Sequence, residues 1–282
     1  MSRGDAAPGV PRARGRQGAP APRRGLVIAG YGTASAAARE RDLEPFARAV
    51  EGAWRRAHPG CGAAAVEAYV SDPVRAKLAR GGVSALSVDD ALAGLHAQGC
   101  TEVDIATSLI VAGESFARLA EAACRWAPRF ERLHLARPLL DGPRDARVLA
   151  AALADRCEAC AGRVVVCIAH GAAGAGERAY ALLGEALAGL GRADVLFGQM
   201  HGAPGLDEVL AQVAAGAPSV RSALLVPVMV ACGAHAAREI AGADEVSWAS
   251  RLRAAGIEVA VARAGLGSMS AVQRLAVEHL LG

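Results

Sequence analysis

The stretch LVIAGYGT at residues 26–33 decides the fold class, because a similar stretch, VVCIAHGA, follows at residues 165–172. Each is a short apolar run that ends in a glycine-containing segment, as buried parallel strands do. The two stretches are offset by 139 residues, and this alignment pairs Tyr31 with His170. The recurrence indicates that one strand-and-loop unit is present twice.

Two further pairs of segments support an internal repeat. VDDAL at residues 88–92 matches LDEVL at 206–210, and LIVAGE at 109–114 matches MVACGA at 229–234. Their offsets of 118 and 120 residues are smaller than that of the first pair, so the halves carry insertions of different length. A tandem duplication of one α/β unit explains these matches. The alternative is a chance likeness between strand ends that are rich in Ala, Val and Gly.

Short apolar runs alternate with longer amphipathic runs, a pattern typical of parallel strands joined by helices. The predicted strands are residues 26–29, 64–69, 102–107 continuing to 110, 133–136, 164–169, 194–199, 223–228 and 258–262. The predicted helices are residues 44–57, 88–98, 115–126, 145–160, 177–190 and 206–215. The turn sequence Asp141-Gly142-Pro143 divides the strands four and four. We therefore expect an α/β protein of two similar domains, 25–142 and 143–282, each a parallel sheet flanked by helices.

The first 24 residues differ in composition from the rest of the chain. They carry six arginines, one aspartate and four prolines, so residues 1–24 are expected to form a disordered tail. The tail holds the excess positive charge, and the remainder has 25 basic and 27 acidic residues. This balance argues against a nucleic-acid partner. The tail lacks the apolar stretch of a signal or anchor, and no later run predicts a membrane span.

Other motifs place the chain in a reducing compartment and argue against a bound organic cofactor. Seven cysteines, an odd number, fit the cytoplasm better than a disulfide framework. Cys157 and Cys160 stand alone in a predicted helix, without the second pair or strand-to-helix turn that a zinc or redox site needs. The glycines after His170 do not have the spacing of a dinucleotide-binding loop. We expect a cytoplasmic protein without an organic cofactor.

Ligands of open α/β sheets collect where parallel strands end. The residues there in the first half are Tyr31, Gly32, Thr33, Gly113 and Glu114, and in the second half His170, Gly171, His201 and His235. Neutral imidazole is a common ligand of divalent Co, Ni, Zn and Fe. Because the ends of neighbouring strands meet at one edge, the three histidines are predicted to share one metal ion. The alternative is that each histidine only caps its loop.

Several motifs now resemble a known family. They are AHG at 169–171 with Tyr180, GQMHGAPGLD at 198–207, VPVMVACGAHA at 226–236, GYGT at 30–33, GE at 113–114 and RPLL at 137–140. In this order they resemble the anaerobic, single-subunit sirohydrochlorin cobaltochelatases of cobalamin synthesis, over residues 25–282. The resemblance implies a class II chelatase fold, with a tetrapyrrole in the cleft between two similar domains. It also implies that His170 and His235 are the catalytic and metal-site histidines.

The chain departs from the family pattern at the metal site. His201 stands where the family commonly has a glutamate that contacts the metal, and Ala234 stands where it commonly has an aspartate. The resemblance thus implies His170 and His235 as metal ligands, and His201 is predicted as the third ligand from its place after a strand, at the position of the family's glutamate. An all-imidazole site would suit Co, Ni, Cu and Zn and would release a hard ion such as Mg²⁺ readily.

The expected function is insertion of a divalent metal, cobalt before nickel, iron or zinc, into sirohydrochlorin. The other strand-end residues, Tyr31, Gly32, Thr33, Gly113, Glu114 and Gly171, are expected to line the tetrapyrrole. Two alternatives stay open: a chelatase specific for iron or nickel, and a metal or tetrapyrrole carrier without turnover. Sirohydrochlorin is the expected partner, and the sequence leaves open whether the chain forms a homo-oligomer.

Overall fold

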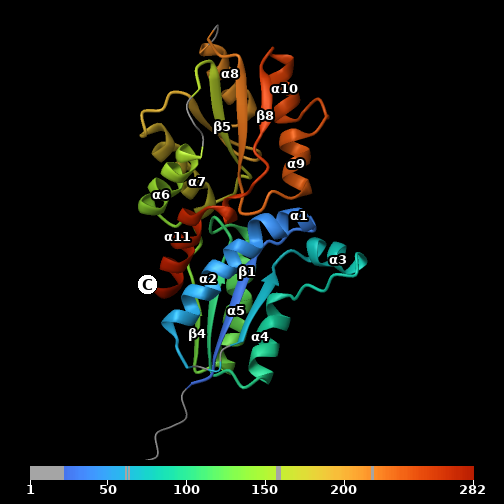
Figure 1. Ribbon diagram of the computed structural model, residues 1–282, viewed down its shortest axis with the longest axis vertical. Coiled ribbons are helices and arrows are strands. Elements are labelled where there is room, and N and C mark those ends of the chain that lie inside the picture. Colours follow the sequence, from blue (N-terminus) through green and yellow to red (C-terminus); the bar gives the residue numbers. More distant parts are fainter. Residues whose placement is uncertain (1–21, 61, 63, 157–159, 217–218) are drawn as a thin grey trace, which may run out of the picture.

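The computed structural model describes residues 22–60, 62, 64–156, 160–216 and 219–282, and of residues 234–237 the backbone alone. Most of the predicted tail, and Cys157 of the predicted cysteine pair, lie outside the described residues. Figure 1 shows two halves stacked along the long axis of the molecule, with α1 and α9 at their junction.

Each half contains a four-stranded parallel sheet, as the sequence predicts. The first sheet has the order β2-β1-β3-β4 and the second has the order β6-β5-β7-β8. The strands are β1 (Arg24–Gly30), β2 (Ala64–Tyr69), β3 (Glu102–Thr107), β4 (Arg132–Leu135), β5 (Arg163–Ala169), β6 (Val195–Gln199), β7 (Ser222–Val228) and β8 (Glu258–Val261). β1 and β5 hold equivalent central places and are buried over six of their seven residues. The chain thus repeats one topology, the fold expected of a class II chelatase.

Helices cover both faces of each sheet. They are α1 (Ala36–Ala38), the π-helical turn η1 (Arg39–Leu43), α2 (Glu44–Ala57), α3 (Asp72–Arg80), α4 (Val88–Ala97), α5 (Glu114–Trp126), η2 (Ala127–Arg129), α6 (Pro143–Asp155), α7 (Ala175–Ala188), α8 (Leu206–Ala215), α9 (Ala234–Ala241), α10 (Trp248–Ala254), η3 (Leu266–Ser268) and α11 (Ser270–Leu281). In α2, for example, Phe46, Val50 and Trp54 recur every four residues and are all buried, which explains why this segment is helical. Among the described residues, no helix has the length and apolar character needed to cross a membrane.

Two predicted element ends are wrong. The strand expected to run to residue 110 ends at Thr107, because the chain then turns into the loop that leads to α5. The helix predicted over 145–160 ends at Asp155, and Cys160 is not helical. The helical reading of the cysteine pair therefore fails at Cys160.

The C-terminal helix links the two halves. The buried residues of α11 are Val272, Leu275, Ala276, His279 and Leu280, a helical spacing that forms one apolar face. This helix contacts α2 and β3 of the first half and α6 of the second, and Figure 1 shows it beside α2. One apolar cluster accordingly contains residues of both halves. The domain boundary at residue 142 stays a prediction, because the last segment of the chain packs on both sides of it.

Candidate metal site at the strand ends

Two of the three predicted histidines lie side by side. His170 directly follows β5, and His201 comes two residues after the neighbouring strand β6. The backbone pairing of these strands continues past their ends, since the His201 N–H donates to the carbonyl oxygen of His170 at 2.9 Å. The ring centroids are 4.9 Å apart and the ring planes are inclined by 64°. The sheet itself therefore brings the two imidazoles together.

Gly171 permits this close approach of the two strand ends. Its φ is +94°, a conformation that side chains disfavour. A Cβ at this position would lie 1.9 Å from the carbonyl oxygen of His201, which is part of the backbone and cannot swing away. Glycine is thus required here to hold His201 beside His170.

The two rings are open to a ligand. His170 is exposed, and the His201 side chain is 60% exposed. Two imidazole nitrogens that bind one ion at about 2 Å each lie about 3 Å from one another. Rings with centroids 4.9 Å apart reach that separation after a small side-chain rotation. The pair can therefore supply two ligands to one divalent ion.

The third predicted histidine is placed by its backbone alone. His235 lies in the first turn of α9, after β7, and β7 is the other neighbour of β5. Its side chain is outside the described part of the structure. Within the described residues, no group of three or more His, Cys, Asp or Glu side chains could hold a metal. A three-histidine site stays a prediction.

Glu239 lies beside the histidine pair and was not predicted from the sequence. Its Oε2 lies 3.5 Å from Nε2 of His201, so a carboxylate adjoins the imidazole pair. The surroundings of the histidine pair therefore include a carboxylate, which the predicted all-imidazole site did not have. In the sequence, Glu239 follows His235 by four residues, which places both on one face of a helix. Because α9 was not predicted, this spacing could not be interpreted.

The first strand end of the other half faces this region. Tyr31 is 54% exposed, whereas Thr33 is buried. The Thr33 Oγ1 accepts a hydrogen bond from the Ser35 N–H at 3.2 Å. A Cβ added to Gly233, the residue before α9, would lie 2.6 Å from this same Oγ1. The loop after β1 is therefore in contact with the loop that leads to His235.

A second contact between the halves involves Gly113, which precedes α5. A Cβ at Gly113 would lie 3.6 Å from the Cβ of Ala172, a residue of the loop after His170. Glu114, the next residue, is exposed, and its carboxylate pairs with Arg118 on the same helix at 2.5 Å. The structure thus brings Gly113 to the second half, while Glu114 makes its ion pair within the first.

A buried phenol and a half-buried thiol near the junction stay neutral at ordinary pH. Burial raises the pKa of the Tyr69 phenol to about 12, and Gly32 packs on its ring. Burial also raises the pKa of the Cys232 thiol to about 11. The Cys232 thiol is therefore protonated and uncharged at ordinary pH.

A surface hollow of about 480 Å³ lies elsewhere on the second sheet. It is lined by residues where strands begin, Arg163 and Val164 of β5 with Asp194 and Leu196 around the start of β6. This is the end of the sheet opposite to His170, so the hollow does not belong to the predicted site.

Solved structures similar to this chain show its fold. SirB from Bacillus subtilis, solved with Fe³⁺, superposes with a TM-score of 0.60 at 13% identity, over 91% of this chain and 94% of SirB. The multidomain protein DR2241 from Deinococcus radiodurans, described as structurally similar to chelatases, has a TM-score of 0.58 at 18% identity, over 92% of this chain and 55% of that protein. At these identities the likeness concerns the fold alone.

Sequence relatives identify the family. The sirohydrochlorin cobaltochelatase CbiKC of Nitratidesulfovibrio vulgaris is 29% identical over 274 residues, which are 94% of this chain and 92% of the relative. The sirohydrochlorin cobaltochelatase of Salmonella typhimurium is 30% identical over 215 residues, 76% of this chain and 80% of the relative. Residues 24–282 match the cobalt chelatase (CbiK) family. The chain belongs to the cobalt chelatase (CbiK) family.

Proposed function

We propose that this protein is an enzyme that inserts divalent cobalt into sirohydrochlorin. The observation that carries the proposal is the pair of exposed imidazoles, His170 and His201, at the junction of the two halves in a chain of the cobalt chelatase family. Both curated relatives described above are named for this reaction. The family points to a metal ion as substrate, and cobalt is the ion we propose, with Ni, Fe and Zn as competitors.

The reaction requires ligand exchange on the ion and loss of two protons from the ring. The ion sheds its water ligands, four pyrrole nitrogens bind it, and the two N–H protons leave, so one divalent ion replaces two protons. We assign ion binding and proton acceptance to His170 and His235, because an imidazole offers one lone pair that serves either purpose. The His235 assignment rests on its place at the start of α9 and on the family resemblance.

The partners of the two rings suggest which nitrogen faces the ion. His170 Nδ1 lies 3.3 Å from the Gly171 carbonyl oxygen, and His201 Nε2 lies 3.5 Å from the Glu239 carboxylate. A proton on each of these nitrogens leaves the lone pair on Nε2 of His170 and on Nδ1 of His201. Such partners orient metal-bound imidazoles and raise their basicity. We therefore propose His201 as the third metal contact, with Glu239 as the group that orients it.

The remaining strand-end residues are proposed to bind the tetrapyrrole. They are Tyr31, Gly32, Thr33, Gly113, Glu114 and Gly171. The exposed Tyr31 ring offers an aromatic face on which a flat ring could stack. The contacts of Thr33 with Gly233 and of Gly113 with Ala172 support this proposal, because they hold the first-half loops against the second half.

An anaerobic assay of the purified full chain tests the function. Sirohydrochlorin is mixed with Co, Fe or Ni in turn, and metal insertion is followed by the change in the absorption spectrum. We expect fastest turnover with cobalt, and none with a His170→Ala/His235→Ala double variant. Failure of every metal to enter the ring, while metal or sirohydrochlorin still binds, would identify a carrier instead. Faster turnover with iron or nickel would overturn the choice of cobalt.

We also propose that the protein works in the cytoplasm without an organic cofactor. Within the described part of the chain no cysteine forms a disulfide, in keeping with a reducing compartment, and these cysteines are Cys100, Cys124, Cys160, Cys167 and Cys232. Fractionation of its own cells tests the first statement, and the bound chromophores of the purified protein test the second. An organic chromophore other than a tetrapyrrole would contradict the second.

A further inference from the structure

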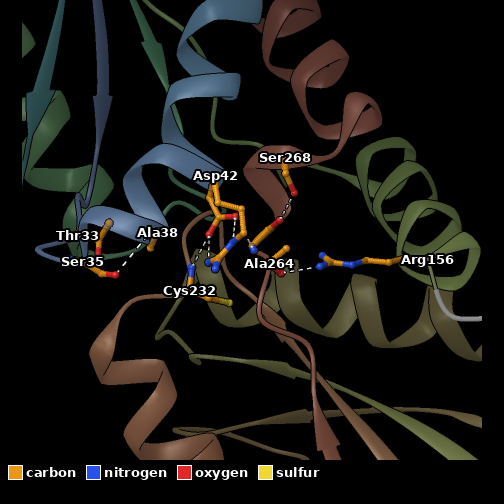
Figure 2. A network of polar contacts seen from close by, with 10 residues as sticks. Thr33, Ser35, Ala38, Asp42, Arg156, Cys232, Ala264 and Ser268 are labelled. Carbon is orange, nitrogen blue, oxygen red and sulfur yellow. Dashed lines mark hydrogen bonds and ion pairs between the residues drawn. The ribbon is translucent and has the colours of Figure 1, made fainter.

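Asp42 joins the two halves from a fully buried position. It lies in the π-helical turn η1 of the first half, and its side chain is 0% exposed. One carboxylate oxygen accepts the Cys232 N–H at 3.1 Å, and the other accepts the Gly265 N–H at 2.9 Å. Both donors belong to the second half, in the loops that follow β7 and β8, and Figure 2 shows this network.

The buried charge of Asp42 is compensated. The Arg41 guanidinium donates to both carboxylate oxygens, at 2.8 and 2.7 Å. This hydrogen bonding raises the pKa of Arg41 above its ordinary value. Bonds from N–H groups to an ionised carboxylate are stronger and shorter than neutral ones, so Asp42 fixes its partners more firmly than a serine or asparagine would.

Glycines in the second half make room for this contact. A Cβ at Gly265 would lie 2.3 Å from the Val230 carbonyl oxygen and 2.9 Å from Oδ2 of Asp42. A Cβ at Gly267 would lie 2.4 Å from the carbonyl oxygen of Asp42. Any side chain at either position would push the η1 turn away from the second half.

The Cys232 bond matters because of the segment that contains it. Cys232 precedes Gly233, the residue before α9, and lies three residues before His235. Asp42 binds this segment at Cys232, and Thr33 packs against it at Gly233. Residues of the first half thus fix the start of α9, although His235, the proposed metal ligand on this helix, belongs to the second half.

We propose that Asp42 is a positioning residue for the metal site. By fixing the loop between β7 and α9, it sets the distance of His235 from His170 and His201. Asp42 touches neither metal nor tetrapyrrole, and acts through the backbone of Cys232. This inference rests on the proposed function only in taking His235 as a metal ligand.

The main test is the Asp42→Asn variant of the full chain. An amide of the same size can accept only one of the two backbone N–H bonds, and its NH₂ group cannot accept the other. Cobalt is titrated into the protein, and the visible absorption of the bound ion reports its ligand geometry. We expect cobalt affinity to fall by about tenfold, with an altered spectrum, as when groups that orient metal ligands are removed. The KM for sirohydrochlorin should change little.

Asp145→Asn is the matched control. Asp145 is also buried, at 3% exposure, and also accepts a backbone N–H, that of Asp141 at 3.1 Å. It lies on α6, and its histidine neighbour is His279 of α11, 3.4 Å away. The control should lower the melting temperature as Asp42→Asn does, yet leave cobalt affinity and spectrum as in the wild type. Equal loss of cobalt binding in the control would show that Asp42 acts through general stability, and would overturn the proposal.

Arg41→Gln provides a second variant if Asp42→Asn does not fold. Arg41 is 34% exposed, and its loss removes the two hydrogen bonds that hold the buried Asp42 carboxylate in position for its backbone donors. We expect a smaller fall in cobalt affinity in the same direction, and unchanged affinity and spectrum would contradict the proposal. If the wild type inserts Fe or Ni in place of Co, that ion replaces cobalt in the titration. A wrong choice of metal can therefore be told apart from a wrong assignment of Asp42.

Discussion

The two halves of the molecule have the same topology but different chemistry at their strand ends. In each half, the strand β1 or β5 is followed by one residue and then by a glycine of positive φ. In the first half these are Tyr31 and Gly32, whose φ is +86°, and in the second half they are His170 and Gly171, whose φ is +94°. The repeat aligned from the sequence is therefore a structural repeat. The repeated backbone places a different side chain, Tyr31 or His170, at the end of the equivalent strand, and we propose that this difference gives the two halves different roles in binding.

The equivalent glycines also show how far the halves have diverged. A Cβ at Gly32 would meet the Tyr69 side chain at 2.5 Å, whereas one at Gly171 would meet the backbone of His201 at 1.9 Å. A side chain can move and a paired backbone cannot. The second half thus holds its strand ends more tightly, as the proposed metal site would require.

The largest expected effect is a difference in turnover between variants of the two equivalent strand-end residues, His170 and Tyr31. His170→Ala should lower the turnover number by about 100-fold or more, because it removes an ion ligand or proton acceptor, and His235→Ala should do the same. Tyr31→Ala should mainly raise the KM for sirohydrochlorin, since Tyr31 is proposed to contact the ring. Steady-state kinetics with cobalt measure both. A Tyr31→Ala variant as inactive as His170→Ala would mean that the halves share the chemistry.

The next effect concerns the third metal contact. His201→Ala should weaken cobalt binding by about tenfold, whereas His201→Glu should keep a ligand there and shift preference towards harder ions, because oxygen replaces nitrogen. Competitive titration of Co against Mn or Mg measures the shift. If His201→Ala binds cobalt as the wild type does, His201 is only a neighbour of the site.

A smaller effect compares the two glycines. Gly171→Ala should cost roughly 2–3 kcal/mol of stability, because it combines a strained φ with a backbone clash. Gly32→Ala should cost less, about 1–2 kcal/mol, since its φ is similar but the clash is with a side chain and not with paired backbone. Thermal unfolding of both variants tests the order. A larger loss for Gly32→Ala would show that the first half is the more tightly held.

The smallest effect concerns a helix start in the first half. Asp90 accepts hydrogen bonds from the backbone and hydroxyl of Ser87 at the start of α4, and these bonds hold the Asp90 pKa below its ordinary value. Because the folded pKa is the lower one, the stabilisation is present above the unfolded pKa and is lost as pH falls through the folded pKa. Asp90→Asn should therefore cost about 0.5 kcal/mol at pH 7 and nothing in strong acid. A cost that is the same at both pH values would exclude an ionised carboxylate as the cause.

Local patterns predicted most of the fold. All eight strands lie within two residues of their expected starts, because buried parallel strands are continuous apolar runs. The helices missed include α3, α9 and α10, which have ten residues or fewer and too few turns for a clear periodicity. α11 was missed although it is longer, and only the structure shows that its apolar face packs against both halves.

The site was predictable where it depends on strand ends and not where it depends on contacts between halves. His170 and His201 follow paired strands, so their proximity could be inferred from the sheet alone. Glu239 required the unpredicted helix α9. Asp42 required the packing of one half on the other, since its partners lie 190 and 223 residues away along the chain. No local pattern encodes such a contact.

Diffraction from crystals of the full chain soaked anaerobically with cobalt, recorded at the cobalt absorption edge, shows directly which side chains bind the ion. We expect one anomalous peak within about 2.2 Å of Nε2 of His170 and Nδ1 of His201, with His235 as a further ligand. A cobalt peak at the strand ends of the first half, or one in the second half that His170 does not contact, would contradict this expectation.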